Sequence, residues 1–213
     1  MIKLPRELLL CLLYKGAEYG LLIGLVRHGK TDWNEQGKIQ GQTDIPLNEV
    51  GIVQAKALAE RLSREDQIWD AVISSDLQRA HATAQIIASK LNIPLLESEP
   101  RLRERYFGEV EGTREQERHE RWGTNWREVA EGVESNAEVR ARGLSAINEW
   151  KLKYPKRNLL VVSHGSFLAQ IMEEICSDLE DQYISNLSYS ILELRDEKWH
   201  PQLYNCTIHL NEA

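Results

Sequence analysis

Two short and almost uninterrupted apolar runs constrain the fold of this chain more than any other feature of its sequence. They read LLIGLV at residues 21–26 and LLVV at residues 159–162. A strand that is hydrophobic at nearly every position is typical of a parallel sheet with helices on both faces. The two runs therefore predict buried parallel strands, and the apolar segment at residues 71–73 predicts a third.

Helical patterns fill the intervals between these strands. Apolar residues recur at helical spacing from Leu47 to Leu62, with Asn48 as the N-cap, and a second such pattern follows Asp76, which can cap it. Strands that alternate with helices predict an α/β fold, a three-layer α/β/α sandwich with a mainly parallel sheet. Further elements are predicted as helices at residues 136–152 and 167–175, and as strands at residues 94–96, 188–194 and 199–207.

The polar segment at residues 113–135 interrupts this alternation. It carries Trp122 and Trp126 one helical turn apart, which predicts an inserted helical lid. With no linker or repeat in the sequence, we expect one domain at residues 21–213, preceded by an N-terminal extension at residues 1–20. The apolar run in that extension is shorter than the roughly 20 residues of a membrane span, so no membrane partner is expected.

Charge and cysteine content narrow the function classes. The chain has 213 residues and a net charge of −7, which disfavours nucleic acid as a partner. An acidic protein that binds an anion must gather its positive charge in one pocket. The three cysteines, Cys11, Cys176 and Cys206, form no CxxC pair, so we expect neither a disulfide framework nor a zinc site, and a cytoplasmic location.

Both apolar runs end in the same way, with a histidine and a glycine. His28 follows the first run in LVRHG and His164 follows the second in VVSHG. Ligands of open α/β sheets bind at the carboxyl ends of the strands, so the two histidines are expected to meet there. Arg27 precedes His28, and Arg79 lies in the first turn of the helix after the third strand, where its side chain leans back over the sheet. Guanidinium groups match phosphate oxygens two at a time, which predicts a phosphate pocket.

Six sequence blocks carry a wider resemblance. In chain order they are LVRHGKTDWN (25–34), QG (40–41), PLNEVG (46–51), SSDLQRA (74–80), LRERYFGEVEG (102–112) and VVSHGS (161–166). Together they resemble the histidine phosphatase superfamily, in the branch shared by cofactor-dependent phosphoglycerate mutases and small broad-specificity phosphatases. The resemblance covers about residues 21–210, nearly the whole chain.

The resemblance implies a role for each matching position. His28 is expected to be the nucleophile that forms a phosphohistidine, Glu104 the general acid and base, and His164 the second catalytic histidine. The positions expected to bind phosphate or the rest of the substrate are Arg27, Asn34, Gln40, Gly41, Arg79 and Gly165. The nearby carboxylates Glu109 and Glu111 are expected to be capping or structural.

Phosphoryl transfer chemistry is compatible with this set. The attacking nitrogen of His28 must be neutral, with the other ring nitrogen held as N–H by a backbone carbonyl. The two arginines should lower the pKa of His28, and together with a protonated His164 they could stabilise the charge on the phosphoryl oxygens. Since these cations belong to the protein, no metal and no other cofactor is expected.

The sequence therefore predicts a metal-independent phosphomonoesterase, a phosphoric monoester hydrolase that acts on a small phosphorylated metabolite. One alternative is a phosphoglycerate mutase, although the mutases of this family carry a longer segment between the glutamate and the second histidine. The other alternative is an inert binding module, which would have no need of five intact site residues. The natural substrate stays open, as do a homodimer and the effect of three departures from the family pattern, Lys30, Arg105 and Val110.

Overall fold

A computed structural model of the chain describes residues 21–176, 179 and 183–211. The predicted extension at residues 1–20, with Cys11, lies outside the described residues. One sheet holds five strands in the order β2-β3-β1-β4-β5. Their bounds are β1 Leu21–Arg27, β2 Ala71–Ser74, β3 Leu159–Ser163, β4 Tyr189–Arg195 and β5 Lys198–Cys206.

The sheet is mainly parallel, as predicted. β3 pairs in parallel with both β1 and β2, while β4 is antiparallel to β1 and β5 is antiparallel to β4. Four of the five strands therefore run in the same direction. The closing pair of strands is confirmed as β4 and β5, whereas the strand expected at residues 94–96 is reduced to a single bridge between Leu95 and Val72.

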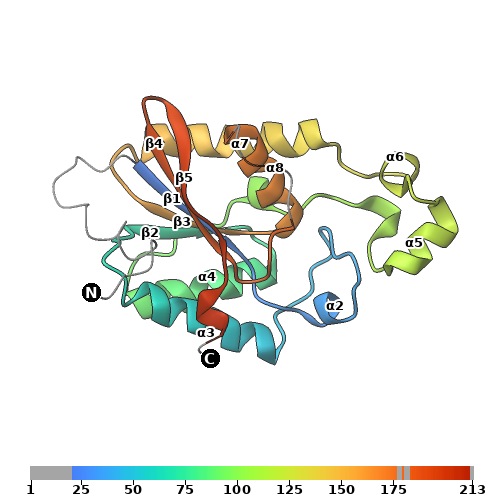
Figure 1. The fold of residues 1–213 in the computed structure, drawn as a ribbon, viewed down its shortest axis with the longest axis horizontal. Coiled ribbons are helices and arrows are strands. Elements are labelled where there is room, and N and C mark those ends of the chain that lie inside the picture. Colours follow the sequence, from blue (N-terminus) through green and yellow to red (C-terminus); the bar gives the residue numbers. More distant parts are fainter. Residues whose placement is uncertain (1–20, 177–178, 180–182, 212–213) are drawn as a thin grey trace, which may run out of the picture.

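Helices cover both faces of the sheet and make the predicted three layers (Figure 1). One face is covered by α3 (Glu49–Leu62) and α4 (Gln78–Leu91), and the other by α7 (Asn136–Lys153) and α8 (Gly165–Ile175). Alternate residues of β1 point to opposite sides, as the pleat of a strand requires. Leu22 and Val26 belong to the hydrophobic cluster under α3 and α4, and Ile23 and Leu25 to the cluster under α7 and α8.

The N-terminal caps of α3 and α4 differ in whether local sequence is enough to predict them. Asn48 caps α3 as predicted, because its Oδ1 accepts a hydrogen bond from the Gly51 N–H at 2.9 Å. The prediction that Asp76 caps α4 is wrong. Asp76 is paired with Arg103 at 2.5 Å, and Asp44 accepts the Gln78 N–H at 2.8 Å. That carboxylate comes from a loop 34 residues earlier, which no local pattern marks.

The predicted lid is confirmed as a helical excursion from the sheet (Figure 1). It contains α5 (Glu115–Trp122) and α6 (Trp126–Val129), which share a hydrophobic cluster of their own around Phe107, Val110 and Trp126. The remaining helical turns are α2 Asp32–Glu35, η1 Pro100–Leu102, η2 Gly108–Val110 and η3 Ile208–Leu210. Across the described ranges, every helix is too short or too polar to traverse a bilayer.

The first turn of α3 packs directly on the main chain that follows β1. A Cβ atom on Gly51 would overlap the carbonyl oxygen of Lys30, which is backbone and cannot rotate away. Gly51→Ala should therefore destabilise the protein by about 1–3 kcal/mol, although alanine is the better helix former. Urea unfolding measures this change. Val53→Ala, which changes a residue of the same helix that is 56% exposed, is the matched control and should stay within about 0.5 kcal/mol of the parent. Equal stability of both variants would contradict the packing argument.

Candidate active site

His28 lies immediately after β1 and is almost completely buried, with 2% of its surface exposed. Its Nδ1 lies 2.7 Å from the carbonyl oxygen of Gly29. A carbonyl oxygen can only accept, so Nδ1 carries the ring proton and Nε2 keeps its lone pair. This is the tautomer that the sequence analysis requires of a histidine nucleophile.

His164 occupies the equivalent place after β3, where it is the N-cap of α8. β1 and β3 are neighbours in the sheet, and their parallel register pairs Arg27 with Ser163. The residues that follow these two therefore emerge side by side. The ring centroids of His28 and His164 lie 5.1 Å apart with the planes tilted by 58°, so the predicted convergence of the two histidines is confirmed.

Arg27 and Arg79 are both buried beside these rings and are anchored by main-chain oxygens. Arg79 donates from Nη1 to the carbonyl of Thr43 at 2.9 Å and from Nη2 to that of Gly41 at 2.7 Å. Arg27 donates from Nη1 to the carbonyl of Ile184 at 2.5 Å. A Cβ atom on Gly165 would lie 3.2 Å from the Arg27 guanidinium carbon, so glycine at this position lets the arginine approach the start of α8.

Four buried nitrogens at this point have no hydrogen-bond partner among the described residues. They are Nε of Arg27, Nε of Arg79 and both ring nitrogens of His164, out of seven such side-chain atoms in the described chain. An unsatisfied buried polar group costs about 1–3 kcal/mol and more if it is charged, so such atoms rarely gather without a function. Their concentration around His28 describes a site that an anion would satisfy.

Burial and the neighbouring charges lower the pKa of both histidines, which favours neutral rings. Burial, followed by Arg79 and Arg27, lowers the pKa of His28 well below its ordinary value. Burial, Arg79 and His28 lower the pKa of His164 in the same way. The expectation of a protonated His164 is therefore wrong for this charge environment, although a neutral ring still donates one N–H. Burial lowers the pKa of Arg79 to about 10, which leaves that guanidinium charged at neutral pH.

Glu104 lies at the amino end of α8, the helix that begins after His164. Its carboxylate accepts hydrogen bonds from the N–H groups of Ser166 at 3.0 Å, Phe167 at 2.8 Å and Arg105 at 2.8 Å. The charge of Glu104 is also the largest influence that raises the pKa of Arg79. The carboxylate is therefore held on the rim of the cationic site.

Asn34 lies in α2, and Gln40 and Gly41 lie in the segment that follows this helix; all three contact residues that support the site. The Oδ1 of Asn34 and the Oε1 of Gln40 both accept hydrogen bonds from the hydroxyl of Thr31, at 3.2 and 3.0 Å. Gly41 has a φ of +53°, a conformation that favours glycine, and its carbonyl anchors Arg79. These contacts give the three residues a supporting role, and their contact with substrate stays a prediction.

Sequence reasoning missed two residues that support the site through hydrogen bonds, Asn186 and Thr83. Asn186 donates from Nδ2 to the carbonyl of His28 at 3.1 Å and to Oδ1 of Asn34 at 3.3 Å. Thr83 accepts the Gly29 N–H at 3.1 Å. Neither residue lies in one of the six sequence blocks, because each acts through a main-chain group that is distant in sequence.

The two carboxylates near Glu104 in sequence, Glu109 and Glu111, have structural partners, as expected. Glu111 accepts the N–H groups of Gln42 and Thr43, at 3.0 and 2.9 Å, and so fixes the loop behind Arg79. Glu109 accepts the indole N–H of Trp122 at 3.0 Å, within the lid. In the described part of the chain, no three His, Cys, Asp or Glu side chains are grouped as metal ligands.

Two of the departures from the family pattern are buried. Val110 belongs to the lid cluster. Arg105 donates to Ser166 Oγ at 3.1 Å, to the Glu134 carbonyl at 2.8 Å and to Asn136 Oδ1 at 2.6 Å, so it ties the base of the lid to α8.

Comparisons with known proteins agree with this geometry. Residues 23–207 match the histidine phosphatase superfamily (branch 1). An uncharacterized phosphatase, PhoE, of Bacillus subtilis (strain 168) is 37% identical over 190 residues, which cover 88% of this chain and 95% of the relative. A metal-independent phosphoserine phosphatase of Arabidopsis thaliana is 36% identical over 90% of this chain and 84% of its own length.

A mutase-like relative and a solved structure extend the comparison. Phosphoglycerate mutase-like protein 4 of Arabidopsis thaliana is 36% identical over 90% of this chain and 87% of its own length. A mycobacterial glucosyl-3-phosphoglycerate phosphatase, solved with VO3, superposes with a TM-score of 0.78 at 27% identity, over 87% of this chain and 99% of the other.

The neutral buried histidines predict how stability depends on pH. Below pH 6.5 the unfolded chain protonates His164 while the folded chain does not, so the unfolded state binds more protons and stability decreases as the pH is lowered. The contribution of His164 to stability is fully present above pH 6.5, and it is lost as the pH falls from 6.5 through the lowered pKa of the folded state. In His164→Gln, urea unfolding between pH 7.5 and 4.5 should give a slope shallower than in the parent by up to about 1.4 kcal/mol per pH unit. Parallel curves for the two proteins would contradict a neutral, buried His164.

Proposed function

Because the chain belongs to the histidine phosphatase superfamily (branch 1) and is a phosphoric monoester hydrolase, we propose that it hydrolyses small phosphorylated metabolites through a phosphohistidine on His28. We further propose that Glu104 is the general acid and base and that the reaction needs no metal. His164, Arg27 and Arg79 then hold the phosphoryl group.

The observation that carries this proposal is the set of four unpartnered nitrogens around His28. Three of them are N–H donors, Nε of Arg27, Nε of Arg79 and one ring nitrogen of the neutral His164, and a phosphoryl group has the negative charge and the acceptor oxygens that these donors need. Fixed donors of this kind stabilise the charge that spreads over the phosphoryl oxygens in the transition state. Nδ1 of His28 donates its proton to the carbonyl oxygen of Gly29, so Nε2 keeps its lone pair and is the nucleophile.

The proposed reaction has two half-reactions, and Glu104 transfers the proton in both. In the first, Nε2 of His28 attacks phosphorus, the N–P bond forms, the ester P–O bond breaks, and the leaving oxygen takes a proton from Glu104. In the second, Glu104 takes a proton from water, the hydroxide oxygen bonds to phosphorus, and the N–P bond breaks. Inorganic phosphate leaves, and both residues return to their starting states. Such proton transfers contribute about 10²–10⁴-fold to a rate.

The similarity to a phosphoglycerate mutase-like protein supports one alternative at the same site. A mutase returns the phosphoryl group of His28 to a bound sugar acid, whereas a phosphatase passes it to water. The two differ in the acceptor and share the first half-reaction. Primed interconversion of 3- and 2-phosphoglycerate, compared with phosphate release, therefore decides between them.

The names of the phosphatase relatives guide the choice of substrates. One acts on phosphoserine and one on glucosyl-3-phosphoglycerate, so both compounds belong in a turnover screen with phosphorylated sugars and nucleotides. We expect phosphate release from at least one small phosphorylated metabolite, with undiminished rates in excess EDTA. Loss of all activity in EDTA would contradict the metal-independent reaction.

The covalent step has its own test. Trapping with ³²P-labelled substrate should give an acid-labile phosphate on His28, and His28→Ala should abolish the label and lower turnover by about 10³-fold or more. His200→Ala, which changes an exposed histidine, is the matched control and should keep both. An unlabelled parent protein that also leaves p-nitrophenyl phosphate intact would favour an inert binding module.

A further inference from the structure

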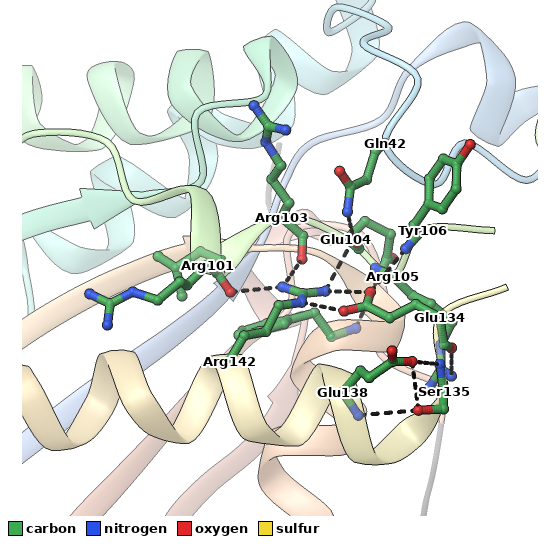
Figure 2. A network of polar contacts seen from close by, with 12 residues as sticks. Gln42, Arg101, Arg103, Glu104, Arg105, Tyr106, Glu134, Ser135, Glu138 and Arg142 are labelled. Carbon is green, nitrogen blue, oxygen red and sulfur yellow. Dashed lines mark hydrogen bonds and ion pairs between the residues drawn. The ribbon is translucent and has the colours of Figure 1, made fainter. Parts of the chain in front are cut away.

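Arg142, on α7, holds the chain segment that carries Glu104. Its Nη1 donates to the carbonyl oxygens of Arg101 and Arg103, both at 2.7 Å, and its Nη2 donates to the carbonyl of Glu104 at 3.2 Å. Figure 2 shows the guanidinium lying among these main-chain oxygens. Residues 103–106 belong to neither a helix nor a strand, so regular secondary structure does not fix their path.

Glu134 binds the same guanidinium and also the main chain after Glu104. It accepts from Arg142 Nε at 2.7 Å through Oε1 and from Nη2 at 3.0 Å through Oε2. The same Oε2 accepts the N–H of Tyr106 at 3.1 Å, two residues beyond Glu104 (Figure 2). All five N–H groups of the Arg142 guanidinium thus have an acceptor, and the pair binds the main chain on both sides of Glu104.

Arg142 also supports the groups that bind the Glu104 carboxylate. Its guanidinium lies 5.0 Å from the centroid of the Phe167 ring. The N–H of Phe167 donates to Glu104 Oε1 at 2.8 Å, so one arginine contacts both the main chain of Glu104 and a residue that holds its side chain. The pair is shielded from solvent, with 19% of the Arg142 side chain and 15% of the Glu134 side chain exposed.

This arrangement matters because proton transfer depends on position. A general acid must reach the leaving oxygen within hydrogen-bond distance, and a displacement of about 1 Å can cost about 10²-fold in rate. Arg142 and Glu134 make no hydrogen bond to the four unpartnered nitrogens around His28. The charge of Arg142 lowers the pKa of His164 less than Arg79, His28 and Arg27 do.

We propose that Arg142 and Glu134 are positioning residues that fix the Glu104 carboxylate for proton transfer to the leaving group. This inference rests on the proposed role of Glu104 and adds the device that places it. Loss of the pair should therefore slow the steps that need a proton from Glu104 and leave phosphate binding unchanged.

Leaving groups of different basicity separate these effects. p-Nitrophenolate departs readily without a proton, whereas the alkoxide of an alkyl phosphate such as β-glycerol phosphate needs one. The ratio kcat/KM reports the steps up to the first irreversible one, which includes departure of the leaving group. A positioning role for the pair predicts a selective loss of kcat/KM on the alkyl ester.

Arg142→Met and Glu134→Gln are the test variants. Each should lower kcat/KM for β-glycerol phosphate by about 10²-fold and that for p-nitrophenyl phosphate by less than about 5-fold, with an unchanged inhibition constant for inorganic phosphate. Arg142→Lys should recover part of the loss, because an ammonium group keeps the charge but lacks the planar fork. Arg140→Met is the matched control. It removes a guanidinium of the same helix that pairs with Glu173 and Glu174, and it should leave both substrates unaffected.

A double variant tests whether Arg142 acts through Glu104. Adding Arg142→Met to Glu104→Gln should lower the alkyl phosphate rate no further, because the group that Arg142 positions is already gone. Equal losses on both substrates, or an additive loss in the double variant, would overturn the positioning role. Should thermal unfolding show that Arg142→Met does not fold, Arg142→Lys and Glu134→Gln decide by the same criteria. A parent protein that hydrolyses neither these esters nor any phosphorylated metabolite of the turnover screen would overturn the proposed function, and this inference with it.

Discussion

The parallel pairing of β1 with β3 is the interaction on which the rest of this site depends. The register that places Arg27 opposite Ser163 brings the next residues, His28 and His164, out of the sheet at the same height. A shift of one residue would send one of the rings to the opposite face of the sheet. Because both strands are buried on both faces, the hydrophobic clusters above and below hold that register. The position of the two rings is thus a property of the core.

A buried cationic site in a protein of net charge −7 requires support, and the main chain supplies most of it. Arg79 is fully buried and bound to two loop carbonyls, and Glu111 holds the same loop through its N–H groups. Within residues 21–176, 179 and 183–211, neither arginine forms an ion pair with a carboxylate, so main-chain oxygens hold the two guanidinium groups in place. Nε of each arginine has no partner among the described residues, and the proposed function uses these free donors for electrostatic stabilisation of a transition state.

Much of this molecule could be predicted from local pattern, and the exceptions share one cause. Buried strands, the Asn48 cap and the His–Gly strand ends are encoded within a few residues, and the structure confirms them. The Asp44 cap of α4 and the contacts of Asn186 join residues 34 or more positions apart. The neutral state of His164 was also missed, because burial and the neighbouring arginines lower the pKa of its ring. Such features depend on tertiary contacts that spacing does not reveal.

The separate hydrophobic cluster of the lid has a consequence for how proteins of this architecture diversify. Phe107, Val110, Trp126 and Ala130 share no buried member with the two clusters that hold the sheet. Substitutions in the lid can therefore accumulate without loosening the strands that aim the histidines. The lid can therefore change in sequence over evolution while the core that places the two histidines is conserved in its packing.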